Sequence, residues 1–272
     1  MIEVEGKTID ILEQDWDLFL ILDACRYDVF KKVYKNILKK EGKVKQAKTK
    51  CNCTKEWMLN NLKGKDCKDI IYIDPIILFE KYLAYDQFFK VIPVWKDKWD
   101  YHYGTIMPSD MTNSAIEQMR AHSNKRIIIH YHQPHPPFLN DEITKIRKSI
   151  ITPEIVLARD NKKKDKTATM EHFIQGNMRR FLGAENAWKL LISLGIEPLD
   201  GMGQIYKHFG MDNIKTAYEE NMKIVLRSIA SFLQNNDKLK IIISSDHSYN
   251  YDRSRAKLRK RSVPWFEING GS

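Results

Sequence analysis

The sequence predicts an α/β fold, a three-layer α/β/α sandwich around a mainly parallel central sheet. Three short apolar runs support this prediction, at residues 18–22, 127–129 and 241–243. Runs rich in β-branched or other aliphatic residues, without polar alternation, are typical of parallel strands that helices cover on both faces. Each run is followed by an Asp or a His, and open α/β sheets bind ligands at the carboxyl ends of their strands. The pattern therefore predicts both the sheet and the edge that carries the site.

The first part of the chain is expected to alternate between strands and helices. Residues 17–23 predict the first central strand, and a helix is expected around residues 29–34. Residues 43–50 are polar and basic, which favours a connection. The next segment, residues 55–62, has helical character.

The second part of the chain continues the same pattern. Residues 69–73 predict a strand, and residues 91–94 predict an edge strand because proline is tolerated there. An amphipathic helix is expected over residues 111–122. The clearest helix lies at residues 218–233, where apolar residues recur on one face. Residues 139–216 are expected to form helical pieces.

Length and composition are those of an ordinary globular protein. The 272 residues are 43% hydrophobic and 29% charged. We expect one domain over residues 1–272, with residues 139–216 as a helical insertion or cap within it. No apolar stretch approaches the roughly 18 residues needed to span a bilayer. The N-terminus lacks the features of a signal peptide, so the expected location is cytoplasmic.

The four cysteines, Cys25, Cys51, Cys53 and Cys67, are expected to be reduced in an intracellular protein. The Cys51-Asn52-Cys53 pair with a distant Cys67 is not a standard zinc ligand set, and a zinc site there is the minor alternative.

The net charge of +10 favours a lysine-rich, solvated surface. One basic segment, residues 253–261, follows the last predicted strand closely and would attract an anionic substrate. No helix-turn-helix, zinc-finger or RNA-binding signature accompanies it, so no specific nucleic acid is expected as a partner. The sequence predicts no oligomeric state.

Asp and His residues at strand ends are the candidate metal ligands. Asp23 ends the first strand, and Asp246-His247 follows the last one. Carboxylate oxygens and imidazole nitrogens converging from distant positions suit a divalent metal ion. Close to them, Arg26 either binds an anionic group or holds Asp28 in place.

A histidine cluster is the second candidate feature. Residues 130–138 contain three histidines and three prolines in nine residues, which predicts a rigid loop at the end of a strand. Its members, His130, His132 and His135, are able to ligate a metal, donate a proton or hydrogen-bond an oxyanion. His135 is the strongest of the three.

The nucleophile is expected at the start of the helix over residues 55–62, either at Thr54 or at Cys53. The helix dipole there favours an alkoxide, a thiolate or a bound phosphate. By local sequence alone, Thr54 is better explained as a simple helix N-cap.

Taken in order along most of the chain, these motifs resemble those of the alkaline phosphatase/sulfatase superfamily, and in particular its small archaeal sulfatase-like proteins. The segments that carry the resemblance are residues 20–28, 53–57, 130–138, 245–247 and 263–266. The resemblance implies an alkaline-phosphatase-like fold.

The resemblance also implies a reaction and roles for individual residues. Asp23, Asp246 and His247 would bind one divalent metal ion (Mn, Mg, Zn or Ca), and Thr54 or Cys53 would be the nucleophile. The reaction implied is transfer of a phosphoryl or sulfuryl group through a covalent intermediate. His135 would contact the transferred group, and Arg26, His130 and His132 are the expected substrate contacts.

Departures from the superfamily pattern narrow the reaction. Lys55 and Trp57 replace key positions of the sulfatase nucleophile motif, and no histidine follows His247 to complete a two-metal site. We therefore expect a single-metal hydrolase or transferase that acts on phosphate esters rather than sulfate esters. Its substrate would be an anionic small molecule or a glycan- or lipid-linked ester. The alternative is a catalytically degenerate binding or regulatory protein of the same fold.

Overall fold

The computed structural model describes residues 2–42, 44–147, 170–234, 236, 238–251 and 262–270. The basic segment at residues 253–261 lies outside the described residues, as do residues 148–169 of the expected insertion.

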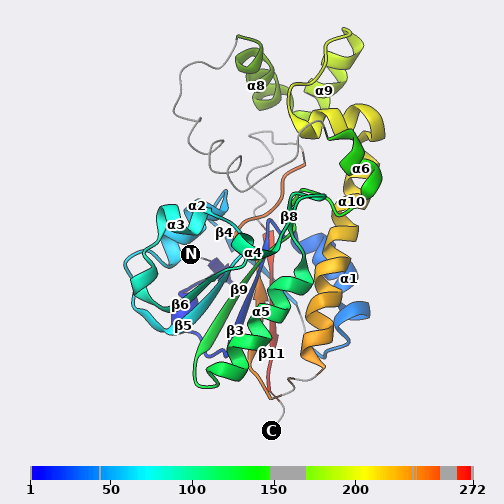
Figure 1. Ribbon diagram of the computed structural model, residues 1–272. Coiled ribbons are helices and arrows are strands. Elements are labelled where there is room, and N and C mark those ends of the chain that lie inside the picture. The colour runs from blue at the N-terminus through cyan, green and yellow to red at the C-terminus, as the bar shows by residue number, and fades with distance from the viewer. Residues whose placement is uncertain are drawn as a thin grey trace.

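The centre of the structure is a sheet whose strands run in the order β2-β1-β4-β11-β10-β3-β9-β5-β6 (Figure 1). Five neighbouring strands are parallel, namely β10 (Ile241–Ser244), β3 (Leu18–Asp23), β9 (Arg126–Pro134), β5 (Cys67–Asp74) and β6 (Phe88–Pro93). The predicted parallel core is confirmed, and β6 lies at the edge as expected.

The other side of the sheet is antiparallel, and the pairing of its strands was not predicted. It consists of β11 (Ser262–Ile268), β4 (Lys45–Thr49), β1 (Ile2–Val4) and β2 (Lys7–Ile9). The expectation of a connection at residues 43–50 is wrong. Ala47 and Thr49 are buried while Lys48 is exposed, the alternation of a half-buried strand. The polar residues of β4 gave no local signal of a strand. Its pairing with β11, which lies far away in the sequence, could not be predicted.

Helices cover both faces of the sheet, which confirms the three-layer arrangement. One face carries α1 (Tyr27–Leu38), α5 (Pro108–Ala121) and α10 (Gly201–Leu233), and the other carries α2 (Thr54–Asn61) and α3 (Leu78–Tyr82). Along β3, Leu20 and Leu22 belong to the first core and Phe19 and Ile21 to the second. Both faces of the strand are buried, so it shows no polar alternation.

Short elements fill the connections. They are η1 (Ile11–Glu13), η2 (Tyr85–Gln87), α4 (Trp95–Lys98), β7 (Trp99–Asp100) and β8 (Thr105–Ile106).

None of the helices in the described ranges combines the length and the apolar character that crossing a membrane demands.

The expected helical insertion contains α6 (Asp141–Ile146), α8 (Met170–Leu182) and α9 (Ala184–Ser193). Its last helix does not end at residue 216, because α10 continues into the core, interrupted only at Gly210. Gly210 has φ 72°, a left-handed conformation that glycine adopts without steric cost. That residues 1–272 form a single domain stays a prediction.

The histidine cluster is less loop-like than expected. Strand β9 continues through His130 and His132 to Pro134, whose partner on β3 is Asp23. The register between the two strands shifts there, because Leu22 pairs with Tyr131 and Asp23 with Pro134, so His132 lies in an irregular part of β9. Only His135 lies beyond the strand. Pairing with β3 thus extends the strand into a proline-rich segment that would otherwise favour a loop.

Candidate active site

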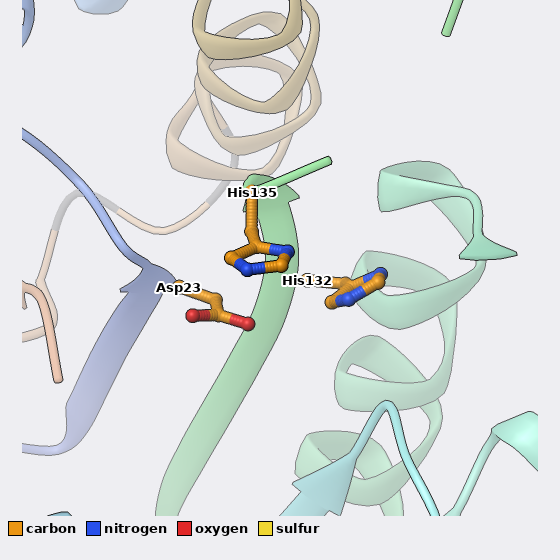
Figure 2. A group of neighbouring side chains, drawn as sticks. All are labelled: Asp23, His132 and His135. Atoms are coloured by element: carbon orange, nitrogen blue, oxygen red, sulfur yellow. The ribbon is translucent and has the colours of Figure 1, made fainter. Parts of the chain in front are cut away.

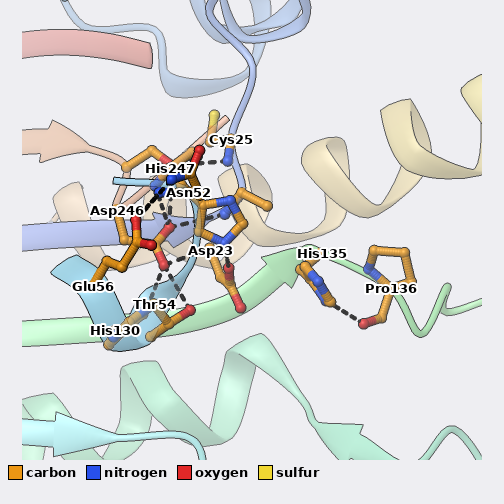
Figure 3. A network of polar contacts seen from close by, with 12 residues as sticks. Asp23, Cys25, Asn52, Thr54, Glu56, His130, His135, Pro136, Asp246 and His247 are labelled. Carbon is orange, nitrogen blue, oxygen red and sulfur yellow. Dashed lines mark hydrogen bonds and ion pairs between the residues drawn. The ribbon is translucent and has the colours of Figure 1, made fainter. Parts of the chain in front are cut away.

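The ends of β3 and β10 bring the three candidate metal ligands together. Asp23, Asp246 and His247 each offer a ligand atom, and these atoms all lie within 4.8 Å of one another. The Nε2 atom of His247 is 3.2 Å from Asp23 Oδ1 and 3.6 Å from Asp246 Oδ2 (Figure 3). Since β3 and β10 are adjacent and parallel, their carboxyl ends place these groups side by side.

Hydrogen bonds fix both oxygens of Asp246. Its Oδ1 accepts from the backbone N–H groups of Ala24, at 3.0 Å, and His247, at 2.8 Å. Its Oδ2 accepts from the Thr54 hydroxyl at 2.7 Å. The carboxylate is fully buried, so its direction is set by the protein and not by solvent.

Thr54 is not the N-cap of α2. The helix begins at Thr54, and Cys53 occupies the cap position without a side-chain cap bond. Glu56 instead accepts a hydrogen bond from the backbone N–H of Asn52 at 2.7 Å, which supports the helix start without Thr54. The Thr54 hydroxyl is therefore available to Asp246, while Cys53 is exposed.

A second group of possible ligands shares Asp23. It consists of Asp23, His132 and His135, whose ligand atoms also lie within 4.8 Å of one another (Figure 2). A hydrogen bond joins His132 Nδ1 to the Thr105 hydroxyl at 2.6 Å, and another joins His135 Nδ1 to the carbonyl of Pro136 at 2.5 Å. These bonds orient the two imidazoles and leave Nε2 of each ring for another partner.

His130 lies beneath the site, in neither group. A hydrogen bond joins its Nδ1 to the Tyr72 hydroxyl at 2.7 Å, and its Nε2 is 3.9 Å from Asp246 Oδ2. The ring is buried and lies edge-on to the rings of Trp57 and Tyr72. The structure places His130 as a support beside Asp246, and its expected contact with substrate stays a prediction.

Arg26 holds Asp28 in place, the second of the two roles that the sequence allowed for it. Its guanidinium donates two hydrogen bonds to Asp28, at 2.9 and 2.5 Å, and lies 4.9 Å above the Tyr251 ring. The pairing holds Asp28 at the start of α1. An additional contact of Arg26 with substrate stays a prediction.

The turn that follows Asp23 is held by residues whose role the sequence did not predict. Ala24 has φ 56°, an uncommon conformation for a residue with a Cβ. The Tyr218 hydroxyl donates to the Ala24 carbonyl at 2.7 Å and accepts from the Arg26 N–H at 3.0 Å. Ser245 Oγ accepts from the Cys25 N–H at 2.8 Å. Helix α10 and Ser245, which directly follows β10, thus fix the backbone that carries Asp23.

Tyr72 and Thr105 orient the imidazoles of His130 and His132, a role that the sequence did not predict either. Tyr72 lies inside a predicted strand, and its only signal is a hydroxyl within a buried apolar run. Such a hydroxyl requires a hydrogen-bond partner, but the sequence does not say which one.

The pKa values of Asp23 and His132 favour the protonation states that bind a metal ion at neutral pH. Burial acts to raise the pKa of Asp23, but the imidazoles of His135, His247 and His132 lower it well below its usual range. Burial and the neighbouring His135 lower the pKa of His132 to about 4. At neutral pH, Asp23 is therefore anionic and His132 is neutral, with a lone pair free to bind.

His247 behaves differently. Burial acts to lower its pKa, but the carboxylates of Asp246 and Asp23 outweigh burial and raise it to about 9. In the metal-free protein, an imidazolium therefore supplies the positive charge between the two carboxylates at neutral pH. A divalent cation would replace that proton.

The donor set fits a divalent metal ion. Asp23 Oδ1 is buried and accepts no hydrogen bond from the described residues, although His247 Nε2 lies near it. Two buried carboxylates with an imidazole match the oxygen and nitrogen ligands that Zn and Mn accept. Neither of the two groups found in the described part of the chain contains a cysteine, so the alternative zinc site at Cys51, Cys53 and Cys67 gains no support.

Comparisons with known proteins give remote similarities of structure. No family model matches the sequence, and no curated protein matches it. The chain is similar to the C-terminal periplasmic domain of EcEptC from Escherichia coli, in complex with Zn, at 11% identity and a TM-score of 0.46, covering 99% of this chain and 75% of that one. It is also similar to a protein in the alkaline phosphatase superfamily from Vibrio parahaemolyticus, at 9% identity and a TM-score of 0.46, covering 94% of this chain.

A third similar structure is the lipoteichoic acid synthase LtaP from Listeria monocytogenes, at 12% identity and a TM-score of 0.37, covering the full length of this chain. The chain spans 60% and 62% of the length of the Vibrio and Listeria proteins. Similarities this remote do not assign an activity, so the chemistry depends on the residues of this chain.

Proposed function

We propose that this protein is a metal-dependent phosphoester hydrolase or phosphotransferase of the alkaline phosphatase/sulfatase superfamily, with Thr54 as its nucleophile. The observation that carries the proposal is the hydrogen bond from the Thr54 hydroxyl to Asp246, within the group formed by Asp23, Asp246 and His247. The order of motifs along the chain, described above, supports the same superfamily.

Asp23, Asp246 and His247 would hold the metal ion, with Thr54 beside it. When bound, the ion stabilises negative charge on the transferred group and lowers the pKa of a neighbouring hydroxyl. We assign the ion to this group rather than to Asp23, His132 and His135 because a carboxylate of this group, Asp246, accepts a hydrogen bond from the Thr54 hydroxyl at the start of α2.

The residues of the chain have separate tasks in the reaction. Thr54 Oγ1 loses its proton and forms a bond to phosphorus while the ester P–O bond breaks, and the leaving oxygen takes up a proton, so the step neither gains nor loses protons. Asp246 Oδ2, which already accepts the Thr54 hydrogen bond, orients that hydroxyl for attack. The amino end of α2 adds a positive potential at the same point.

The second step regenerates the enzyme. Water, or the hydroxyl of an acceptor, attacks phosphorus, the phosphothreonine P–O bond breaks, and the Thr54 oxygen regains a proton. His132 and His135 lie close to Asp23, where they are able to bind the leaving or the attacking oxygen. An unmodified threonine suits phosphoryl transfer, so phosphate esters are the proposed substrates.

A panel of simple esters tests the proposal. Protein stripped with a chelator would be resupplied with Mn, Mg, Zn or Ca and assayed on an aryl phosphate, a bis-aryl phosphodiester and an aryl sulfate. We expect turnover of a phosphate ester that is lost on stripping and restored by one of the ions. Turnover of the sulfate alone would refute the phosphate assignment. Metal binding without turnover, even with an added alcohol acceptor, would favour the catalytically degenerate binding protein.

Metal binding is also expected to release protons in a pH-dependent way. Since the pKa of His247 is about 9, this imidazole carries a proton at pH 7 that a bound metal must displace. Asp23 is already ionised there and contributes none. We expect Mn²⁺ to release about one proton at pH 7, falling toward zero as the pH rises past the pKa of His247. Calorimetry in buffers of different ionisation enthalpy measures this number, and equal release on both sides of that pKa would contradict the assignment of His247.

A further inference from the structure

Two loops carry candidate site residues at the carboxyl edge of the sheet. One begins directly after Asp23, the last residue of β3, and the other contains His135, just beyond the end of β9 (Figure 3). Backbone groups beyond a strand end have no partner in the sheet, so they need partners elsewhere. Asp23 and His135 nevertheless place ligand atoms within 4.8 Å of each other. Holding those atoms at that distance requires contacts that fix both loops.

Helix α10 contacts the first loop through Tyr218. The Tyr218 hydroxyl donates to the Ala24 carbonyl at 2.7 Å and accepts from the Arg26 N–H at 3.0 Å. The Ala24 carbonyl also accepts from the Tyr249 N–H at 3.1 Å, whereas no second acceptor for the Arg26 N–H is found among the described residues. Tyr218 is fully buried, so solvent is excluded from both of its hydrogen bonds. Its hydroxyl therefore closes the turn that follows Asp23.

The second loop is held by Asn221. Its Oδ1 accepts from the Leu139 N–H at 2.8 Å, and its Nδ2 donates to the carbonyls of Pro137, at 3.1 Å, and His135, at 3.4 Å. The side chain is buried, so these backbone groups depend on it and not on water. An amide has both a donor end and an acceptor end, and this loop uses both. A side chain with acceptors alone is unable to make the same contacts.

Tyr218 and Asn221 belong to one turn of α10. Residues three positions apart lie on the same side of a helix. On this side Met222 also contacts the first loop, with its sulfur 3.8 Å from the Cys25 sulfur. A single helical turn thus contacts both loops of the site, although neither Tyr218 nor Asn221 is itself a candidate metal ligand.

We propose that Tyr218 and Asn221 are positioning residues that act on different sides of the reaction centre. Tyr218 acts through the turn after Asp23 and sets the geometry of the metal ligands. Asn221 acts through the loop that contains His135 and sets the side that binds the leaving or the attacking oxygen. The inference rests on the proposed function, in which Asp23 holds the ion and His135 binds one of these oxygens. It predicts two separable defects.

Calorimetric titration of the chelator-stripped full chain with Mn²⁺ tests the role of Tyr218. Tyr218→Phe removes the hydroxyl and keeps the ring that stacks on Tyr249. We expect roughly tenfold weaker Mn²⁺ binding, because the turn after Asp23 loses two hydrogen bonds, and a loss of activity that excess Mn²⁺ restores. Tyr34→Phe is the matched control. It also removes a buried tyrosine hydroxyl that donates to a carbonyl, that of Gly42, and it should bind Mn²⁺ as the wild type does.

Binding of inorganic phosphate to the Mn²⁺-loaded chain tests the role of Asn221 without requiring turnover. Asn221→Asp keeps an oxygen for the Leu139 N–H but is unable to donate to the carbonyls of His135 and Pro137. We expect unchanged Mn²⁺ affinity, roughly tenfold weaker phosphate binding, and a loss of activity that excess Mn²⁺ does not restore. Asn236→Asp is the control on the carboxyl side of the same helix, where Asn236 Nδ2 donates to a backbone carbonyl at 2.8 Å. It should behave as the wild type does.

Other outcomes overturn the inference. Wild-type Mn²⁺ affinity in Tyr218→Phe, or wild-type phosphate affinity in Asn221→Asp, would refute the role of that residue. Loss of both affinities in both variants, with lower thermal midpoints, would show that this turn of α10 supports the fold without separate roles. Failure of the proposed function is distinguishable, because the wild type would then bind no Mn²⁺ or turn over no ester. A wild type that does both, with both variants matching it, would refute the positioning roles alone.

Discussion

Replacing Asp246 by asparagine is expected to abolish tight metal binding and to lower the turnover of phosphoesters by at least about a thousandfold. The amide is the same size, and its oxygen is able to keep the hydrogen bonds from the N–H groups of Ala24 and His247. It lacks the negative charge, and its NH₂ group is unable to accept the proton of the Thr54 hydroxyl. Metal content after dialysis, together with steady-state rates, measures both effects.

A matched control exists at the end of β5. Asp74 is also a buried aspartate at a strand end, but it accepts a hydrogen bond from the Ile76 N–H and belongs to neither metal group. Burial raises its pKa well above the usual range, which favours the neutral form, and asparagine is a close replacement for that form. Asp74→Asn should keep the metal and the activity. If Asp246→Asn also kept both, the proposed metal site would be refuted.

Replacing Thr54 by alanine is expected to lower turnover by at least about a thousandfold while the metal stays bound. The variant loses the oxygen that forms the covalent intermediate but keeps Asp23, Asp246 and His247. The helix should still form, since alanine is a strong helix former and Glu56 continues to bond the Asn52 N–H. Rates and metal content test the two halves of this expectation, and mass spectrometry of the wild type would locate a phosphoryl group on Thr54.

Two further variants make the Thr54 test decisive. Thr54→Ser keeps a hydroxyl at the helix start and should retain most of the activity, whereas Cys53→Ser should have little effect because Cys53 is exposed. Full activity in Thr54→Ala combined with loss in Cys53→Ser would make Cys53 the nucleophile. Full activity in both would mean that no covalent intermediate forms on either residue.

The sheet and the edge that carries the site were predictable because their signal is local. Strand β3 is apolar at every position before Asp23, a pattern typical of a strand buried on both faces. Parallel strands direct their carboxyl ends to one edge, so Asp23 and Asp246 were expected near each other. Strand β4 was not predicted because its signal is not local. Its Lys and Gln side chains face solvent, and only pairing with β1 and β11 makes it a strand.

The rule that sites form at the carboxyl ends of parallel strands does not say which strand ends contribute to the site. Asp74 ends β5 as Asp23 ends β3, yet Asp74 accepts a hydrogen bond from the turn that follows it, whereas Asp23 belongs to both candidate metal-binding groups. Arg26 had two interpretations, and the position of Asp28 on the first turn of α1 favours the structural one. The direction of each side chain depends on backbone geometry and packing that no short stretch of sequence contains.

By itself, the sequence determined the parallel sheet, the main helices and the kinds of ligand at the strand ends, because apolar periodicity and polar residues at strand ends are local properties. Only the tertiary structure placed Thr54, rather than Cys53, against Asp246, a contact between residues 192 positions apart. It alone placed His130 beneath the site and joined His132 and His135 to Asp23. Contacts of this kind depend on strand order, register and the packing of α2 on the sheet, which form when distant segments bury their apolar faces together.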